Sequence, residues 1–272
     1  MLHGFFNSYK IGLIGHTQLS VVVGVNIVCW SGGKDSTATI IVAKKLGIPI
    51  DYILFSEVMF DETISCELPE HMEFVKTAAI PKFKEWGYET KILHHNKTYM
   101  DYFNHVRKKG KYKGKKVGFP MADKCNARVC KIAPIEKFLK SLKKENEITQ
   151  FVGICADEPI RLQRLSDDKR SLLAEQGITE SMARDICMQY GLLSPYYTYS
   201  KRGGCFCCPN AGKKQLAFIR THHKALWNKL LLLEQEDNLI GNIFNTKTGV
   251  SIKTLEEEFL WDDRQLSLFD FL

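Results

Sequence analysis

Several features are absent from this chain of 272 residues, and each absence narrows its class. There is no internal repeat and no low-complexity segment, so neither a repeat architecture nor a compositionally biased chain is expected. The apolar run at residues 11–30 is interrupted by His16, Gln18 and Asn26, so we expect no membrane-spanning segment there. A basic stretch followed by a small-residue cleavage site is also missing, so we expect no signal peptide and a cytoplasmic protein.

The length allows one large α/β domain, or one domain with appendages, around a substantial core. The formal net charge of +7 suits anionic ligands, but it is too small and too diffuse to indicate a nucleic-acid partner by itself. The nine cysteines are an odd number, which argues against a disulfide framework. Four of them are expected to be structural: Cys29, Cys66, Cys155 and Cys187.

A glycine motif, Ser-Gly-Gly-Lys-Asp-Ser at residues 31–36, follows an apolar run and precedes a helical pattern that ends at Gly47. Glycines let the backbone approach a ligand closely, and the N-terminus of the next helix presents N–H groups and a positive dipole to an anion. The spacing differs from the Walker pattern G-x-x-x-x-G-K-S/T, which disfavours a P-loop NTPase. We therefore expect a nucleotide phosphate here; the alternative is a glycine turn that only joins a strand to a helix. The expected nucleotide-binding residues are Ser31, Gly32, Gly33, Lys34, Asp35, Ser36 and Thr37.

Short apolar runs alternate with helical patterns along the first part of the chain. Such alternation implies right-handed crossovers and a parallel sheet that is buried on both faces. The expected fold is α/β, a doubly wound and mostly parallel five-stranded sheet with helices on both faces. Strands are expected at 26–30, 52–57, 90–94 and 150–155, and helices at 36–46, 69–86, 98–108 and 134–144.

Beyond Ser166 the strand rhythm stops, so only helices are expected there. One helix is expected over 179–190, and a second carries an apolar stripe from Leu216 to Leu233 that we assign to the core. We therefore expect a nucleotide-binding α/β domain at residues 1–165 and a helical, cysteine-rich extension at residues 166–272, packed on that domain.

Polar side chains follow several of the expected strand ends. Because ligands of parallel sheets bind beyond the carboxyl ends of the strands, the glycine motif, Ser56 and Asp157 should converge on one crevice. Asp157 and Glu158 are candidates for holding Mg²⁺ or orienting an acceptor. Arg161 and Arg164 are candidates for contacting an anionic ligand. The alternative for this segment is a surface ion-pair cluster that opens a helix.

Five cysteines fall in two groups. Cys-Phe-Cys-Cys-Pro at residues 205–209 contains a C-x-x-C pair with a third thiol between, and a C-x4-C pair lies upstream. Two such pairs predict a four-thiolate site for zinc or an iron–sulfur cluster, with free thiols as the alternative. Cys207 is either a substitute ligand or a free thiol. The expected metal ligands are Cys125, Cys130, Cys205 and Cys208.

Together these motifs resemble the phosphoadenosine-phosphosulfate (PAPS) reductase-like family of the adenine-nucleotide alpha-hydrolase superfamily, whose nucleotide-binding PP-loop reads Ser-Gly-Gly-x-Asp-Ser. The similarity is spread over most of residues 25–210. Besides the glycine motif, the similar segments within this range are 67–71, 131–139 and 153–158. It implies cleavage of ATP between its α- and β-phosphates, with ATP as substrate and Mg²⁺ as cofactor. In cluster-bearing relatives two cysteine pairs hold a 4Fe–4S cluster, so the resemblance favours iron–sulfur over zinc.

One motif of the thioredoxin-linked members is missing. Those reductases carry a nucleophilic cysteine in a C-terminal Glu-Cys-Gly-Leu/Ile-His motif, whereas this chain has no cysteine after Cys208. We therefore expect an ATP-dependent sulfur transferase or a related nucleotidyl-activating enzyme. The alternatives are a sulfonucleotide (PAPS or adenylyl-sulfate) reductase that takes its thiol from Cys207 or a partner protein, and a nucleotide or metal sensor without turnover. The expected catalytic residues are Lys34, Asp35, Asp157 and Glu158.

A basic stretch at residues 107–116 gathers lysines and arginine around Tyr112 and two glycines. Such a segment can neutralise backbone phosphates, which predicts nucleic acid as the acceptor; the alternative is an ordinary solvated charge run. The expected partners are an adenine nucleotide, a sulfur donor protein and nucleic acid. The basic side chains are Arg107, Lys108, Lys109, Lys111, Lys113, Lys115 and Lys116.

Overall fold

The computed structural model describes residues 23–120, 126–143, 146–201, 203–244 and 249–269. By their internal contacts these residues fall into two compact units. The sheet unit contains the described residues up to Ser56, together with Glu73–Leu93 and Ala133–Ser194. The second unit contains Glu57–Met72, His94–Ile132 and the described residues from Pro195 onward. The expected division into domains at residues 1–165 and 166–272 stays a prediction.

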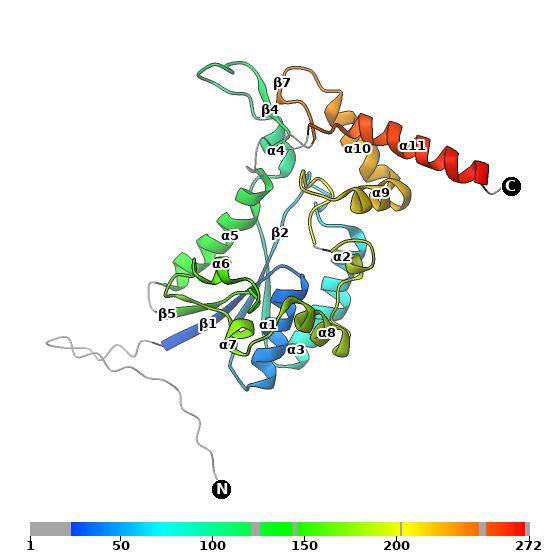
Figure 1. Ribbon diagram of the computed structural model, residues 1–272. Coiled ribbons are helices and arrows are strands. Elements are labelled where there is room, and N and C mark those ends of the chain that lie inside the picture. The colour runs from blue at the N-terminus through cyan, green and yellow to red at the C-terminus, as the bar shows by residue number, and fades with distance from the viewer. Residues whose placement is uncertain (1–22, 121–125, 144–145, 202, 245–248, 270–272) are drawn as a thin grey trace, which may run out of the picture. The chain divides into compact units, whose positions relative to one another are not determined.

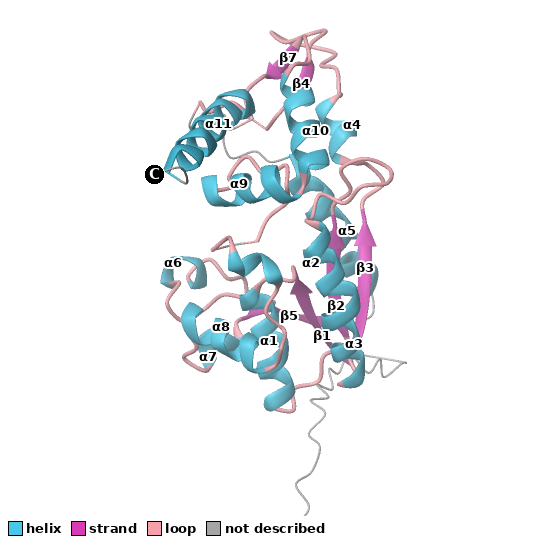
Figure 2. Cartoon of the chain, turned by 90° about the vertical axis from the view of Figure 1, so that its right-hand side faces the viewer, coloured by secondary structure: helices cyan, strands magenta, loops and turns pink. Residues whose placement is uncertain are grey.

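Five strands form the sheet (Figure 1). Their order is β3-β2-β1-β5-β6; β1 is parallel to β2 and β5, and β5 is parallel to β6. Figure 2 shows the arrows of β2 and β3 pointing the same way. The expected α/β fold with a five-stranded parallel sheet is confirmed. The strands are β1 (Val23–Trp30), β2 (Tyr52–Glu57), β3 (Glu89–His94), β5 (Asn146–Phe151) and β6 (Lys169–Arg170).

One face of this sheet packs on α5 (Asn126–Leu142). Alternate residues of a strand point to opposite faces, so the apolar residues of β1 divide between the two sides of the sheet. Figure 1 shows α5 and α1 on opposite sides of the strands. The buried residues of the α5 face are Val25, Ile27, Leu54, Leu139 and Ile148.

The other face packs on α1 (Lys34–Lys45) and α3 (Ile80–Glu85). The Trp30 ring lies 5.0 Å from the Phe83 ring in an edge-on arrangement, and its Nε1 donates a hydrogen bond of 2.8 Å to Thr37 Oγ1. The helix expected over 69–86 is a continuous run with a π-helical middle. This run consists of α2 (Pro69–Glu73), η1 (Phe74–Ala79) and α3, and the second unit contains all of α2 except Glu73. The remaining helices of the sheet unit are α6 (Pro159–Leu162), α7 (Leu172–Glu175) and α8 (Glu180–Gln189).

The strand expected at 150–155 is β5, and the expectation is wrong at both ends. β5 begins at Asn146 and ends at Phe151, after which the chain leaves the sheet. Gly153 then lies directly against the start of α1, where a Cβ would come within 2.5 Å of the backbone nitrogen of Ser36. An apolar run cannot reveal this contact, because it depends on a helix more than a hundred positions away.

Three further expectations are wrong. Strands do occur beyond Ser166, but β6 and β7 (Leu239–Gly241) are too short to produce an apolar pattern. The helix expected over 98–108 is α4 (Tyr99–Phe103). The apolar stripe from Leu216 to Leu233 lies on two helices, α9 (Lys213–His222) and α10 (Lys224–Glu234), because His223 has the non-helical angles φ −126° and ψ 54°.

The second unit has its own core. Side chains from α4, α9, α10 and α11 (Ile252–Phe269) pack into one apolar cluster that includes Phe60, Phe206 and Trp227. β4 (Lys116–Gly118) pairs in parallel with β7, so closely that a Cβ on Gly118 would lie 2.3 Å from the carbonyl oxygen of Gly241.

Within the described residues, no helix combines the length and the apolar character needed to cross a membrane.

Replacement of Gly153 by alanine tests the contact between the end of β5 and α1. We expect Gly153→Ala to lower the free energy of unfolding by about 1–3 kcal/mol, because the new methyl group meets rigid backbone. Urea denaturation followed by circular dichroism measures the loss. Gly24→Ala is the matched control, since a Cβ at Gly24 meets nothing within 4 Å. Equal stability of both variants would contradict the packing described here.

Candidate functional site

The glycine motif forms the turn between β1 and α1. Gly32 has φ 74°, a conformation that glycine adopts without strain, and Gly33 is the N-cap residue of α1. The turn is held by its own hydroxyls: Ser36 Oγ accepts from the backbone N–H of Ser31 at 3.2 Å and donates to the Gly33 carbonyl at 3.1 Å. Gly33 has no side chain that could cap the helix, so a ligand can approach the first turn of α1 closely.

A cavity of about 420 Å³ opens beside this turn. It lies at the carboxyl ends of the neighbouring strands β1 and β5. From β1 the sheet extends to β2 and β3 on one side, and from β5 it extends to β6 on the other. The cavity therefore occupies the switch point of the sheet. Its size is that of a small-molecule pocket. The lining residues are Cys29, Ser31, Gly33, Asp35, Ser36, Val152, Gly153, Ile154, Arg161, Leu165 and Lys169.

The cavity therefore brings together five of the residues expected to bind a nucleotide: Ser31, Gly33, Asp35, Ser36 and Arg161. The others are not among the described residues that line it. Thr37 is buried and accepts the Trp30 indole N–H, Ser56 is buried in β2, and Arg164 is exposed after α6.

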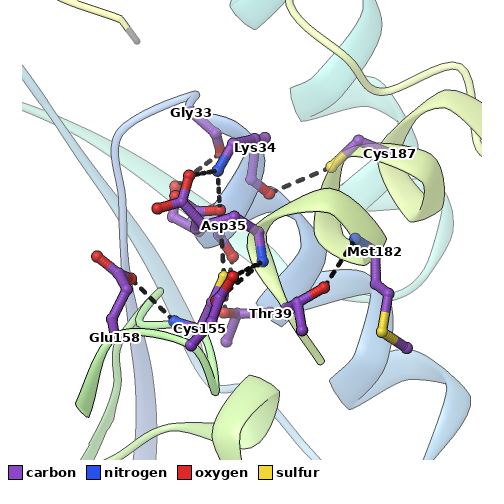
Figure 3. A network of polar contacts seen from close by, with 12 residues as sticks. Gly33, Lys34, Asp35, Thr39, Cys155, Glu158, Met182 and Cys187 are labelled. Atoms are coloured by element: carbon purple, nitrogen blue, oxygen red, sulfur yellow. Dashed lines mark hydrogen bonds and ion pairs between the residues drawn. The ribbon is translucent and has the colours of Figure 1, made fainter. Parts of the chain in front are cut away.

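Lys34 is the centre of a polar network (Figure 3). Its side chain is about 10% exposed, and its Nζ lies 2.6 Å from Asp35 Oδ1 and 2.8 Å from Glu180 Oε2. Burial disfavours the ammonium ion, but the hydrogen bonds to the two carboxylates outweigh burial and raise the pKa of Lys34. Lys34 is thus a charged group that joins α1 to α8.

Two buried thiols complete this network (Figure 3). Cys155 Sγ donates to Asp35 Oδ1 at 3.3 Å, and Cys187 Sγ donates to the Lys34 carbonyl at 3.2 Å. Burial raises the pKa of the Cys155 thiol, and it raises that of Cys187 to about 12. Both groups are therefore protonated hydrogen-bond donors at neutral pH, which fits the structural role expected of them.

The carboxylates that follow β5 have protein partners. Asp157 Oδ1 accepts from the backbone N–H of Glu180 at 3.1 Å, in the first turn of α8. Glu158 Oε2 accepts from the backbone N–H of Cys155 at 3.0 Å, and its other oxygen pairs with Arg161. Only the Glu158–Arg161 contact is an ion pair of the kind expected as the alternative, and a direct catalytic role of Asp157 and Glu158 stays a prediction.

In the second unit, Cys205 lies with Cys207 of its own motif and with Cys66, which the sequence does not associate with that motif. Cys207 Sγ donates to Cys66 Sγ at 3.4 Å, and both hydrogen-bond to Cys205. These bonds lower the pKa of Cys205 well below its ordinary value, against the opposing effect of burial. Cys205 therefore has a lower pKa than Cys66, whose pKa is raised by burial.

Glu67 lies beside these thiols, with Oε1 4.0 Å from Cys205 Sγ and 3.5 Å from Lys131 Nζ. Burial and the neighbouring Cys205 raise its pKa to about 7. The sequence marked Cys66 as a structural cysteine and Glu67 as part of the similar segment 67–71, but it did not place them beside Cys207 and Cys205, which lie 141 and 138 positions away.

The predicted four-thiolate set is only partly described. Cys125 lies outside the described residues. Cys130 is buried and donates to the Lys97 carbonyl at 3.4 Å, and Cys208 is half-buried in a turn where its backbone N–H donates to the Cys205 carbonyl. Among the described side chains, no three His, Cys, Asp or Glu residues form a group arranged to hold a metal ion. The metal site stays a prediction.

No protein-family model and no curated protein matches the sequence. Among solved structures, the chain is similar to the U34-tRNA thiolase NcsA from Methanococcus maripaludis, a structure that includes its 4Fe–4S cluster. The comparison covers 83% of this chain and 77% of that chain, at 14% sequence identity and a TM-score of 0.40. A similarity at this level carries no argument about the activity of the chain.

Two substitutions separate the buried and the exposed parts of the Lys34 network. Lys34→Met should cost about 2–4 kcal/mol of unfolding free energy, because it leaves the Asp35 carboxylate without its buried cation. Glu180→Gln should cost less than about 1 kcal/mol, because the Glu180 side chain is about half exposed. Urea denaturation measures both, with Lys140→Met on the exposed side of α5 as control. Equal costs would show that the network depends on the exposed carboxylate instead.

Proposed function

We propose that this chain is an ATP-dependent sulfur transferase, or a related nucleotidyl-activating enzyme, of the PP-loop type. The observation that supports the proposal best is the cavity at the switch point of the sheet, because the glycine motif forms one wall of it. The turn before α1, the side-chain hydroxyls of Ser31 and Ser36, and the close approach of Gly153 shape a site for the polyphosphate of a nucleotide.

The chemistry would proceed in two displacements. An acceptor oxygen attacks the α-phosphorus of ATP, the bond to the bridging oxygen breaks, and pyrophosphate leaves. The acceptor oxygen is then part of an adenylate, so a sulfur nucleophile such as sulfide can displace it as AMP and form the new carbon–sulfur bond. Donors around the glycine motif stabilise the charge that develops on the phosphates.

Asp35 is the catalytic candidate that lines the cavity. Carboxylate oxygens suit Mg²⁺, which would supply charge neutralisation for the phosphates when bound. Asp35 is the candidate to hold it, with Asp157 and Glu158 of the segment after β5 as further candidates. The Lys34 ammonium, 2.6 Å from Asp35 Oδ1, holds the direction of that carboxylate.

A cluster site at Cys125, Cys130, Cys205 and Cys208 belongs to the same proposal. All four are thiols, the ligand type that both 4Fe–4S clusters and zinc take, and the described three lie in the second unit. The 4Fe–4S cluster, which we favour over zinc, would supply sulfur or electron chemistry there when bound.

Nucleic acid is the acceptor that the basic stretch favours. Residues 106–116 form a hairpin that two backbone hydrogen bonds close. The Arg107 N–H donates to the Lys115 carbonyl at 2.9 Å, and the Gly114 N–H donates to the Arg107 carbonyl at 2.8 Å. Lys116 pairs with Glu236, but the other six cations of the hairpin have no ion pair among the described residues. Tyr112 is 39% exposed, with Lys111 over its ring. An unneutralised, protruding strip of this kind suits a phosphate backbone.

Pyrophosphate release tests the reaction. With ATP, Mg²⁺, sulfide and bulk cellular RNA, we expect pyrophosphate to appear, and Asp35→Asn to slow its release by at least about tenfold. Asp185→Asn, an exposed carboxylate on α8, is the matched control and should match the wild type. ATP binding without any pyrophosphate would favour a sensor, and sulfite release from PAPS would favour the reductase; either result would contradict the proposal.

Neutralisation of the hairpin tests the acceptor. Simultaneous Lys→Gln substitution at four of its exposed lysines should weaken RNA binding and reduce the slope of log affinity against log salt by about 3, because each phosphate contact contributes about 0.7–0.9. Fluorescence anisotropy at several salt concentrations measures both. An unchanged salt slope would remove nucleic acid from the proposal. The hairpin set is Lys108, Lys109, Lys111 and Lys113, and the charge-matched control set is Lys137, Lys140, Lys214 and Lys253.

A further inference from the structure

Two cations line the cavity, and they differ in their surroundings. Arg161 pairs with Glu158 one turn away in α6, so its charge is partly neutralised. Lys169 makes no ion pair within 4 Å among the described residues; its charge helps lower the pKa of the neighbouring Asp168, whose carboxylate pairs with Lys143. It is therefore the side chain whose positive charge is most available to an anion in the cavity.

Lys34, the cation of the glycine motif, is engaged elsewhere. Its Nζ lies within 2.8 Å of a carboxylate oxygen of both Asp35 and Glu180. Lys34 is not among the described residues that line the cavity. A polyphosphate would have to break two short ion pairs to recruit Lys34, whereas it would break none to recruit Lys169.

The backbone of β6 fixes the position of Lys169. Lys169 pairs with Gln150 of β5, and the two flanking ladder bonds, from Gln150 N–H to the Asp168 carbonyl and from Val152 N–H to the Arg170 carbonyl, are 2.8 and 2.9 Å long. The Asp168 carboxylate also accepts from the Gln150 side-chain amide at 3.1 Å. This short strand thus places an unpaired cation at the carboxyl end of β5, beside the glycine motif.

We propose that Lys169 is the anion-binding residue of this cavity, where it takes the phosphate groups of a polyphosphate ligand, and that Lys34 is a positioning residue that neutralises Asp35 and joins α1 to α8. The identity of the ligand as a nucleotide rests on the proposed function; the anion-binding role of Lys169 does not.

Calorimetric titration of the full chain tests this assignment with three probes: ATP, inorganic pyrophosphate and adenosine. Lys169→Gln should weaken binding of ATP and pyrophosphate by about tenfold or more, since a charge-assisted hydrogen bond is lost, and should leave adenosine binding unchanged. Lys169→Arg keeps the charge and should stay within about threefold of the wild type. Lys140→Gln removes the same charge from α5, outside the cavity, and should behave as the wild type.

The outcomes separate this inference from the proposed function. If Lys169→Gln binds pyrophosphate and ATP as tightly as the wild type, or if the wild type binds neither, the role of Lys169 is wrong. If pyrophosphate binding depends on Lys169 while ATP and adenosine do not bind, the anion site stands and the nucleotide function fails. Melting temperatures of the Lys169 variants within about 2 °C of the wild type show that the affinity change does not come from unfolding.

Discussion

A buried ammonium ion at the first turn of α1 organises the sheet unit. Lys34 cannot remain charged and buried unless carboxylates surround it, so Asp35 must turn toward it and α8 must bring Glu180 close. Asp35, once held, also receives the Cys155 thiol from the segment after β5. The two ion pairs of Lys34 and the Cys155 bond therefore tie together the glycine motif, α8 and the chain that leaves β5. The glycine motif and the chain that leaves β5 also line the cavity.

The second unit contains a group of three thiols beside a carboxyl group. Cys66, Cys205 and Cys207 lie in contact beside the buried Glu67, and hydrogen bonds from the other two thiols lower the pKa of Cys205. The Lys131 ammonium lies near Glu67. Soft, ionisable sulfur and a protruding strip of exposed cations thus occupy the same unit. The proposed sulfur transfer to an anionic acceptor would draw on both features of this unit.

Much of the sheet unit could be predicted from the sequence because its signals are local. Apolar runs marked β1, β2 and β3, and the side chain of Thr179 caps α8 where the helix was expected to start. The glycine motif was recognisable from a few adjacent residues. Contacts between distant residues were not predictable: Glu180 reaches Lys34 across 146 positions, and Cys66 reaches Cys207 across 141. β6 could not be predicted because its two basic residues show no apolar periodicity, and for the same reason the position of Lys169 at the cavity could not be predicted.

The shortness of β6 has a dynamic consequence. It is an edge strand joined to β5 by few ladder bonds, so it can detach at a small fraction of the free energy of global unfolding. Detachment would withdraw the lone ammonium of Lys169 from the cavity and leave the apolar core intact. Ligand occupancy and fraying of this edge are then thermodynamically linked: an anion that binds the attached form slows hydrogen exchange at the Val152 amide, and a frayed edge releases the anion.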